Sequence, residues 1–100
     1  MLMNKRIEAF SDLLALLEEI LSSPVTRQEC IKKFQDYVFH HGEPIQGANS
    51  SQWDVLNELA MDLDYYEPDT AMRREDPTFY GDERLEREIQ EALNKLHVQA

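Results

Sequence analysis

Apolar residues recur every three or four positions in four stretches of the chain, which is the spacing of one face of an α-helix. The pattern predicts helices over residues 2–21, 26–41, 51–63 and 83–97. Polar residues fill the remaining positions, so each helix should bury one face only. The expected core residues are Ile7, Phe10, Leu13, Leu14, Leu17, Ile20, Leu21, Cys30, Ile31, Phe34, Tyr37, Val38, His41, Trp53, Leu56, Leu59, Ala60, Leu63, Leu85, Ile89, Ala92, Leu93 and Leu96.

Helix-breaking and helix-capping residues stand between these stretches. Pro24 follows the first, and Thr26 with Glu29 predicts a capping box at the start of the second. Ser51 with Asp54 predicts a similar cap for the third helix. Gly42 suits the end of the second helix, because a glycine adopts positive φ there without strain.

The sequence therefore predicts one all-α domain over residues 1–100, a compact four-helix bundle with short connections. The connection from residue 67 to 81 is expected to be irregular and acidic, since Pro68 and Pro77 limit any helix in it to a short turn. Ion pairs at spacing i,i+4 should support the last helix, namely Glu83–Arg87, Arg84–Glu88 and Glu91–Lys95.

Composition narrows the functional class. One cysteine, Cys30, allows no internal disulfide, and no stretch has the length or apolarity of a secretory signal or a membrane span. We therefore expect a soluble cytoplasmic protein. The net charge of −10 argues against direct nucleic-acid binding, which requires Lys and Arg to neutralise phosphates. The same charge would attract a basic protein, although acidity can also serve solubility alone.

Acidic residues concentrate between Trp53 and Tyr80, where eight carboxylates stand against two arginines. If the apolar line of the third helix faces the core, Asp54, Glu58, Asp62 and Tyr65 fall on the opposite face. Acids at this spacing repel each other by about 0.2–0.5 kcal/mol per adjacent pair. This row of acids on the third helix, the acidic ladder, has two explanations. It is either an ordinary solvated face or a surface that meets a basic partner.

A proline corner follows this ladder. Carboxylates beside tyrosines and a stiff Pro68 resemble a protein interface, because rigid aromatic side chains lose little entropy on binding. An alternative is that Tyr66 and Phe79 only cover the edge of the core. The residues predicted to contact a partner are Asp62, Asp64, Tyr65, Glu67, Asp69, Glu75 and Asp76.

Catalytic and metal-binding motifs do not fit these residues. The acids lack the glycine of a calcium loop, and His40 and His41 are adjacent and so point in different directions on a helix. Cys30 lies in an apolar line, which favours a buried thiol over a nucleophile. We expect a binding protein that performs no catalysis and uses no cofactor, metal or small-molecule substrate.

Part of the sequence resembles a known family. The run NELAMDLDYYEPDTAMRREDP, with a last helix ending EIQEALNKL, is similar to the immunity proteins that protect bacteria against colicin D-type toxins. The order of helices also agrees, including the break from Leu21 to Thr26. The Glu67-Pro68-Asp69 corner is the most distinctive element of the resemblance.

The resemblance implies a small acidic four-helix bundle that binds a tRNA-cleaving toxin domain and covers its basic active site in place of tRNA phosphates. Asp64, Glu67 and Asp69 match the family's acidic motif, whereas Asp62, Glu75 and Asp76 extend it. This chain departs from the family by a longer loop from Thr70 to Gly81 and by Trp53, so the partner can differ in sequence or nuclease type. Related proteins guard against toxins of contact-dependent inhibition.

A non-enzymatic regulatory adaptor that binds another basic protein is the alternative function. An adaptor that uses a groove for a partner helix should expose an apolar strip, and the sequence leaves none once the core is assigned.

Overall fold

The computed structural model describes residues 7–41 and 45–99. For residues 98 and 99 it describes the backbone only. Its helices are α1 (Phe10–Ser22), α2 (Arg27–His40), α3 (Ser50–Asp62), α4 (Thr70–Arg73) and α5 (Asp82–Gln99), and the 3₁₀ turn η2 (Leu63–Tyr65) extends α3. These ranges contain no strand. The expectation of an all-helical chain is confirmed, and α4 is a short helix between Pro68 and Pro77, as expected.

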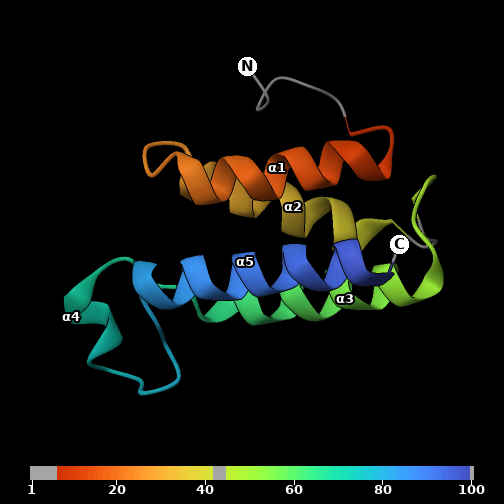
Figure 1. Ribbon diagram of the computed structural model, residues 1–100. Coiled ribbons are helices and arrows are strands. Elements are labelled where there is room, and N and C mark those ends of the chain that lie inside the picture. The colour runs from red at the N-terminus through yellow and green to blue at the C-terminus, as the bar shows by residue number, and fades with distance from the viewer. Residues whose placement is uncertain (1–6, 42–44, 100) are drawn as a thin grey trace.

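The four long helices lie side by side, with α1 against α2 and α5, and α3 against α2 and α5 (Figure 1). Their apolar stripes meet in one core. Phe34, Leu56 and Leu85 are fully buried there, each from a different helix. Trp53, expected in the core, is only partly buried and packs against its edge. The helical period of the sequence thus fixes which side of each long helix is inside.

The start of α1 differs from the prediction. Residues 1–6 lie outside the described part of the chain, and the helix begins at Phe10 instead of residue 2. The Asp12 carboxylate accepts hydrogen bonds from the backbone N–H groups of Glu8 (2.9 Å) and Ala9 (3.1 Å). These bonds give the two N–H groups an acceptor without a further helical turn. Glu8 and Ala9 therefore stay outside the helix. Gly42, expected to end the second helix, also lies outside the described residues.

The predicted capping box of α2 is absent. Thr26 precedes the helix, but its hydroxyl donates to the Glu19 carboxylate (3.1 Å) and is hydrogen-bonded to the Ser23 hydroxyl (3.0 Å) instead of capping the helix. The side chain is therefore used to connect the ends of α1 and α2.

The cap of α3 lies two residues earlier than predicted. Asn49 accepts from the backbone N–H of Gln52 (2.8 Å), and the Gln52 side chain accepts from the backbone N–H of Asn49 (2.9 Å). Gln52 is 2% exposed, and its amide also donates to the Leu96 carbonyl (3.1 Å). The cap thereby joins α3 to the end of α5, which Ser51 and Asp54 would not do.

A buried arginine connects α1, α2 and α5. Arg27 is 3% exposed and donates to the carbonyl oxygens of Ile20 (2.8 Å) and Leu21 (3.1 Å), which the end of a helix leaves without partners. Its Nη1 lies 3.1 Å from the Asp82 carboxylate and 3.4 Å from that of Glu86. Arg27 therefore fixes the first turn of α5 against the end of α1.

Of the three surface pairs expected along α5, the described residues form Arg84–Glu88 alone, at 3.4 Å. The pairs Glu83–Arg87 and Glu91–Lys95 are not formed. Exposed pairs at this spacing are worth only a few tenths of a kcal/mol, so solvation of the separate charges competes with them.

Candidate partner-binding surface

The segment from Glu67 to Phe79 is closed into a loop at its base. The backbone N–H of Glu67 donates to the Tyr80 carbonyl (2.8 Å), and that of Tyr80 donates to the Tyr65 carbonyl (2.9 Å). The loop and its helix α4 project from one end of the helical body (Figure 1). The acidic corner is thus carried on a base attached to both α3 and α5.

The base is held by the arginine network at α5. The Tyr66 hydroxyl donates to the Asp82 carboxylate that also contacts Arg27. The hydrogen bond from Tyr66, followed by the contact with Arg27, lowers the pKa of Asp82. Burial and the same bond raise the pKa of Tyr66 to about 12. Tyr66 also packs against the core, which confirms that at least one aromatic of this segment covers the core edge.

Within the loop, Glu67 and Asp69 have local backbone partners. Asp69 caps α4 by accepting from the backbone N–H of Ala71 (2.8 Å), and the Glu67 carboxylate accepts from that of Asp69 (3.2 Å). Arg73 donates to the Glu67 carbonyl (2.7 Å) and lies against Gly81, where a Cβ atom would be 2.6 Å from its Nη1. A side chain at position 81 would therefore displace the Arg73 guanidinium from this close approach.

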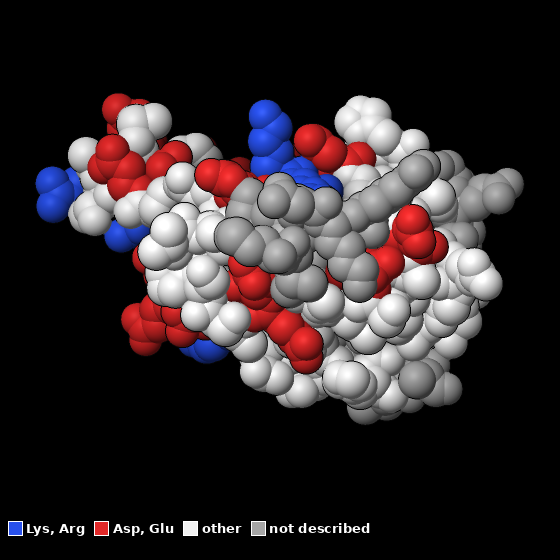
Figure 2. Space-filling model, turned by 90° about the horizontal axis from the view of Figure 1, so that it is seen from above, with Lys and Arg blue, Asp and Glu red and all other residues white. Residues whose placement is uncertain are grey.

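The two acids at the far side of the loop differ. Glu75 is exposed. Asp76 accepts from the backbone N–H (2.9 Å) and the hydroxyl (2.8 Å) of Thr78, and these bonds lower its pKa. Figure 2 shows carboxylates together with some basic groups on the projecting end of the molecule. The loop therefore presents both charges, with the acids in the majority by sequence.

Hydrogen bonds hold two acids at the end of α3, which the helical spacing of the acidic ladder did not predict. Asp62 is partly buried instead of pointing straight away from the core, and its Oδ2 accepts from the Tyr80 hydroxyl (2.9 Å). Burial and this bond raise the pKa of Tyr80. Asp64 is exposed and accepts from the Gln35 amide (2.9 Å). Asp54, Glu58 and Tyr65 are exposed, as expected.

None of the candidate carboxylates forms an ion pair with a lysine or arginine of the described residues. The ion pairs found there join Arg27 to Asp82 and Glu86, and Arg84 to Glu88. The hydrogen bonds that Asp62, Asp64, Glu67, Asp69 and Asp76 accept come from neutral groups. Neutral donors orient a carboxylate and leave its charge in place.

Residues 10–96 match the protein family described as bacterial self-protective colicin-like immunity. The chain belongs to this family. The match covers α1, α2, α3, the acidic loop between α3 and α5, and α5 up to residue 96. No curated protein and no solved structure matches the chain. Membership indicates a toxin-neutralising immunity protein, which agrees with the family expected from the Glu67-Pro68-Asp69 corner at this coarser level.

Sequence reasoning missed two exposed methionines of this immunity protein, of which Met61 lies near the expected Tyr65. Met61 is 55% exposed and Tyr65, one turn later, is 47% exposed, while Met72 on α4 is 43% exposed. No apolar strip was expected outside the core, and Met61 was not named among the exposed residues. Its place in the ladder, three residues after Glu58 and four before Tyr65, was the signal that could have found it.

The described part of this family member offers no metal site, and its one cysteine is buried. No group of three or more His, Cys, Asp and Glu residues is placed there to hold a metal ion. Cys30 is buried, as predicted, and burial raises the pKa of its thiol. None of the helices within the described ranges is long and apolar enough to cross a membrane.

Proposed function

We propose that this immunity protein neutralises the nuclease domain of a colicin D-type toxin, a tRNase, by placing an acidic surface over its active site. The residues that contact the toxin are Asp62, Asp64, Tyr65, Glu67, Asp69, Glu75 and Asp76. The protein acts as a four-helix bundle in the cytoplasm, binds one toxin domain, and performs no chemistry.

The observation that carries the proposal is the set of oriented but uncompensated carboxylates on this surface. Neutral donors hold Asp62, Asp64 and Asp69, so these acids keep both their positions and their charge. A tRNase presents lysines and arginines to phosphates, and fixed carboxylates compete for the same groups. Preorganisation favours the complex because few side chains lose freedom on binding.

The charge of the chain also favours rapid capture. A molecule with a net charge of −10 attracts a basic domain over distances of about 10 Å at 0.1 M salt. Steered association reaches about 10⁸–10⁹ M⁻¹s⁻¹ at low salt. A toxin is then bound before it cleaves many RNA molecules.

Competition between the immunity protein and tRNA tests the proposal. The probe is the basic C-terminal toxin domain that we expect the neighbouring reading frame to encode, incubated with total tRNA. We expect tRNA cleavage to stop at about one equivalent of immunity protein, and labelled tRNA to leave the domain as the protein binds. A ternary complex that retains tRNA, or a toxin domain with no nuclease activity, would contradict the proposed mode of inhibition.

A further inference from the structure

A groove between α3 and α5 lies beside the surface described above. It is a hollow of about 230 Å³ whose lining includes Val55 and Leu59 from α3 and Ala92 from α5. Leu59 and Ala92 are buried at 5% and 6% exposure, so they form an apolar base. The groove belongs to the packing of the two helices and is not part of the acidic loop.

Carboxylates from both helices surround this apolar base. Glu58 and Asp62 line it from α3, and Glu91 lines it from α5. Glu58 and Glu91 are exposed and form no ion pair within the described residues. The Tyr80 hydroxyl holds Asp62 at the same hollow. An apolar base and charged sides are thus combined in one depression.

The remaining charges of the lining do not neutralise it. Glu88 adds a fourth carboxylate, and Arg84 contacts it at 3.4 Å from outside the hollow. Lys95 is the one cation of the lining, and it forms no ion pair with Glu91. With Arg84 counted against Glu88, four carboxylates stand against two cations, which leaves the hollow negative.

We infer that this groove receives an arginine side chain of the partner. The methylene stem of arginine would cover Val55, Leu59 and Ala92, because long cationic side chains bury their stems on apolar surface while the charged head stays near polar groups. The guanidinium carries five N–H donors in a planar fork, so it can serve carboxylates on both sides of the groove. A phosphate or an acidic side chain is repelled there, and a wholly apolar side chain leaves the carboxylates without a partner.

The identity of the partner rests on the proposed function, since the basic toxin domain supplies the arginine. Asp62 belongs to both the groove and the acidic surface, so the two adjoin at the end of α3. The groove would extend the contact from the loop along α3 towards Val55. Glu58 and Glu91 are then specificity residues for this partner.

Titration with N-acetyl-arginine-N-methylamide tests the groove without the toxin. We expect this probe to shift the methyl NMR signals of Val55, Leu59 and Ala92, and the uncharged citrulline analogue to shift none of them. Glu58→Gln with Glu91→Gln should weaken the arginine effect about tenfold, since two charge-assisted contacts are lost. Glu18→Gln with Glu29→Gln removes the same charge from α1 and α2 and should leave it unchanged.

Two results overturn the inference: equal shifts with arginine and citrulline, or arginine shifts spread over all acidic faces alike. Circular dichroism of each variant checks that the helices are retained. In a second arm, Glu58→Gln with Glu91→Gln should weaken binding of the toxin domain about tenfold or more. Unchanged toxin binding by this variant refutes the groove alone, whereas a wild-type chain that binds arginine but no toxin refutes the proposed function alone.

Discussion

Glu67→Lys combined with Asp69→Lys is expected to weaken binding of the toxin domain at least about a thousandfold and to abolish protection of cells. Each reversal replaces an attraction with a repulsion, and close interfacial charge pairs couple by about 1.5–7 kcal/mol. Two such losses of about 2 kcal/mol correspond to a factor near 10³ in affinity. Calorimetric titration and survival of toxin-expressing cells measure the two effects.

The fold should survive this double change. The Glu67 carboxylate accepts one backbone bond, and Asp69 caps a helix of four residues outside the core. We therefore expect the melting temperature to stay nearly constant. Asp69→Asn keeps a capping oxygen and removes only the charge, so it separates the two roles of this residue.

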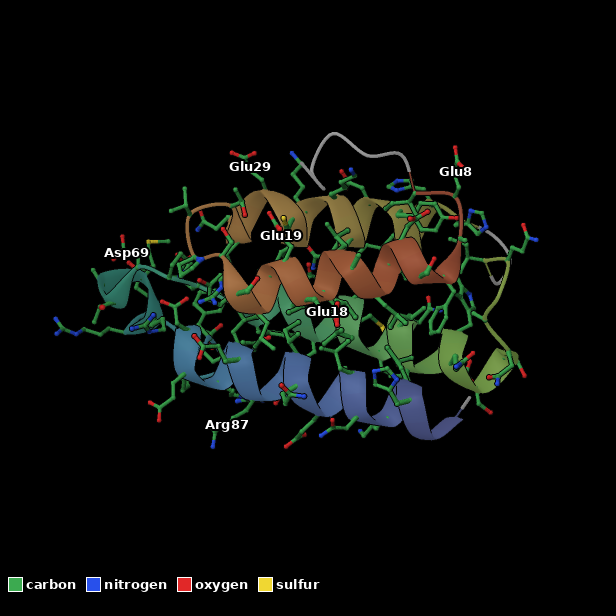
Figure 3. All side chains as sticks on the ribbon, turned by 45° about the horizontal axis from the view of Figure 1, so that its top comes forward. Glu8, Glu18, Glu19, Glu29, Asp69 and Arg87 are labelled. Carbon is green, nitrogen blue, oxygen red and sulfur yellow. The ribbon has the colours of Figure 1, made fainter. Side chains whose placement is uncertain are left out.

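A matched control is available on other helices. Glu18 and Glu29 lie on α1 and α2, whereas Asp69 lies beside α4 (Figure 3). Glu18→Lys with Glu29→Lys makes the same change in net charge and should reduce affinity far less. Equal losses in both variants would mean that only net charge matters. Full protection by the variant reversed at 67 and 69 would remove the acidic corner from the interface.

Arg27→Met is expected to lower the free energy of unfolding by about 3 kcal/mol. The change leaves the carbonyls of Ile20 and Leu21 without their buried donor, and removes the cation from Asp82. A buried polar group that loses its partner costs about 1–3 kcal/mol. Asp82 is half exposed, so water compensates most of the loss on that side. Urea denaturation measures the difference.

Arg87→Met provides the comparison for Arg27. Arg87 is exposed on α5 and its side chain extends away from the helical body (Figure 3). Surface changes of this kind usually alter stability by less than about 0.5 kcal/mol. An Arg27→Met protein as stable as the Arg87→Met protein would show that the buried network contributes nothing. The Arg27 change should also weaken toxin binding, because Asp82 anchors Tyr66 at the base of the loop.

The buried faces of the long helices could be predicted from the sequence because apolar spacing is a local signal repeated many times. The side-chain contacts at the starts of α2 and α3 could not be predicted in the same way. Ser51 and Asp54 have capping chemistry as good as that of Asn49 and Gln52, but only Gln52 also reaches Leu96, 44 residues away. Thr26 likewise bonds to Glu19 and Ser23 instead of capping α2. Long-range partners decided between equivalent local signals.

The sequence predicts which segment forms the candidate surface, but it does not predict how the side chains of that segment are arranged. The sequence locates Glu67 and Asp69 on a proline corner. The bridge between Tyr66 and Tyr80 that closes the loop depends on α3 and α5 lying side by side. The same contact turns Asp62 towards Tyr80, whereas an isolated helix would present it to solvent. Met61 has the helical spacing of Glu58 and Tyr65, so the exposed face of α3 could have been extended to it.

Hydrogen exchange of the immunity protein, free and bound to the toxin domain, tests the central claim most directly. Backbone amides protected only in the complex report the segments that the partner covers or stabilises. We expect new protection in residues 64–76 and at the end of α3, with α1 unchanged. New protection confined to α1 and α2, with residues 64–76 exchanging as in the free protein, would contradict an acidic surface that takes the place of RNA.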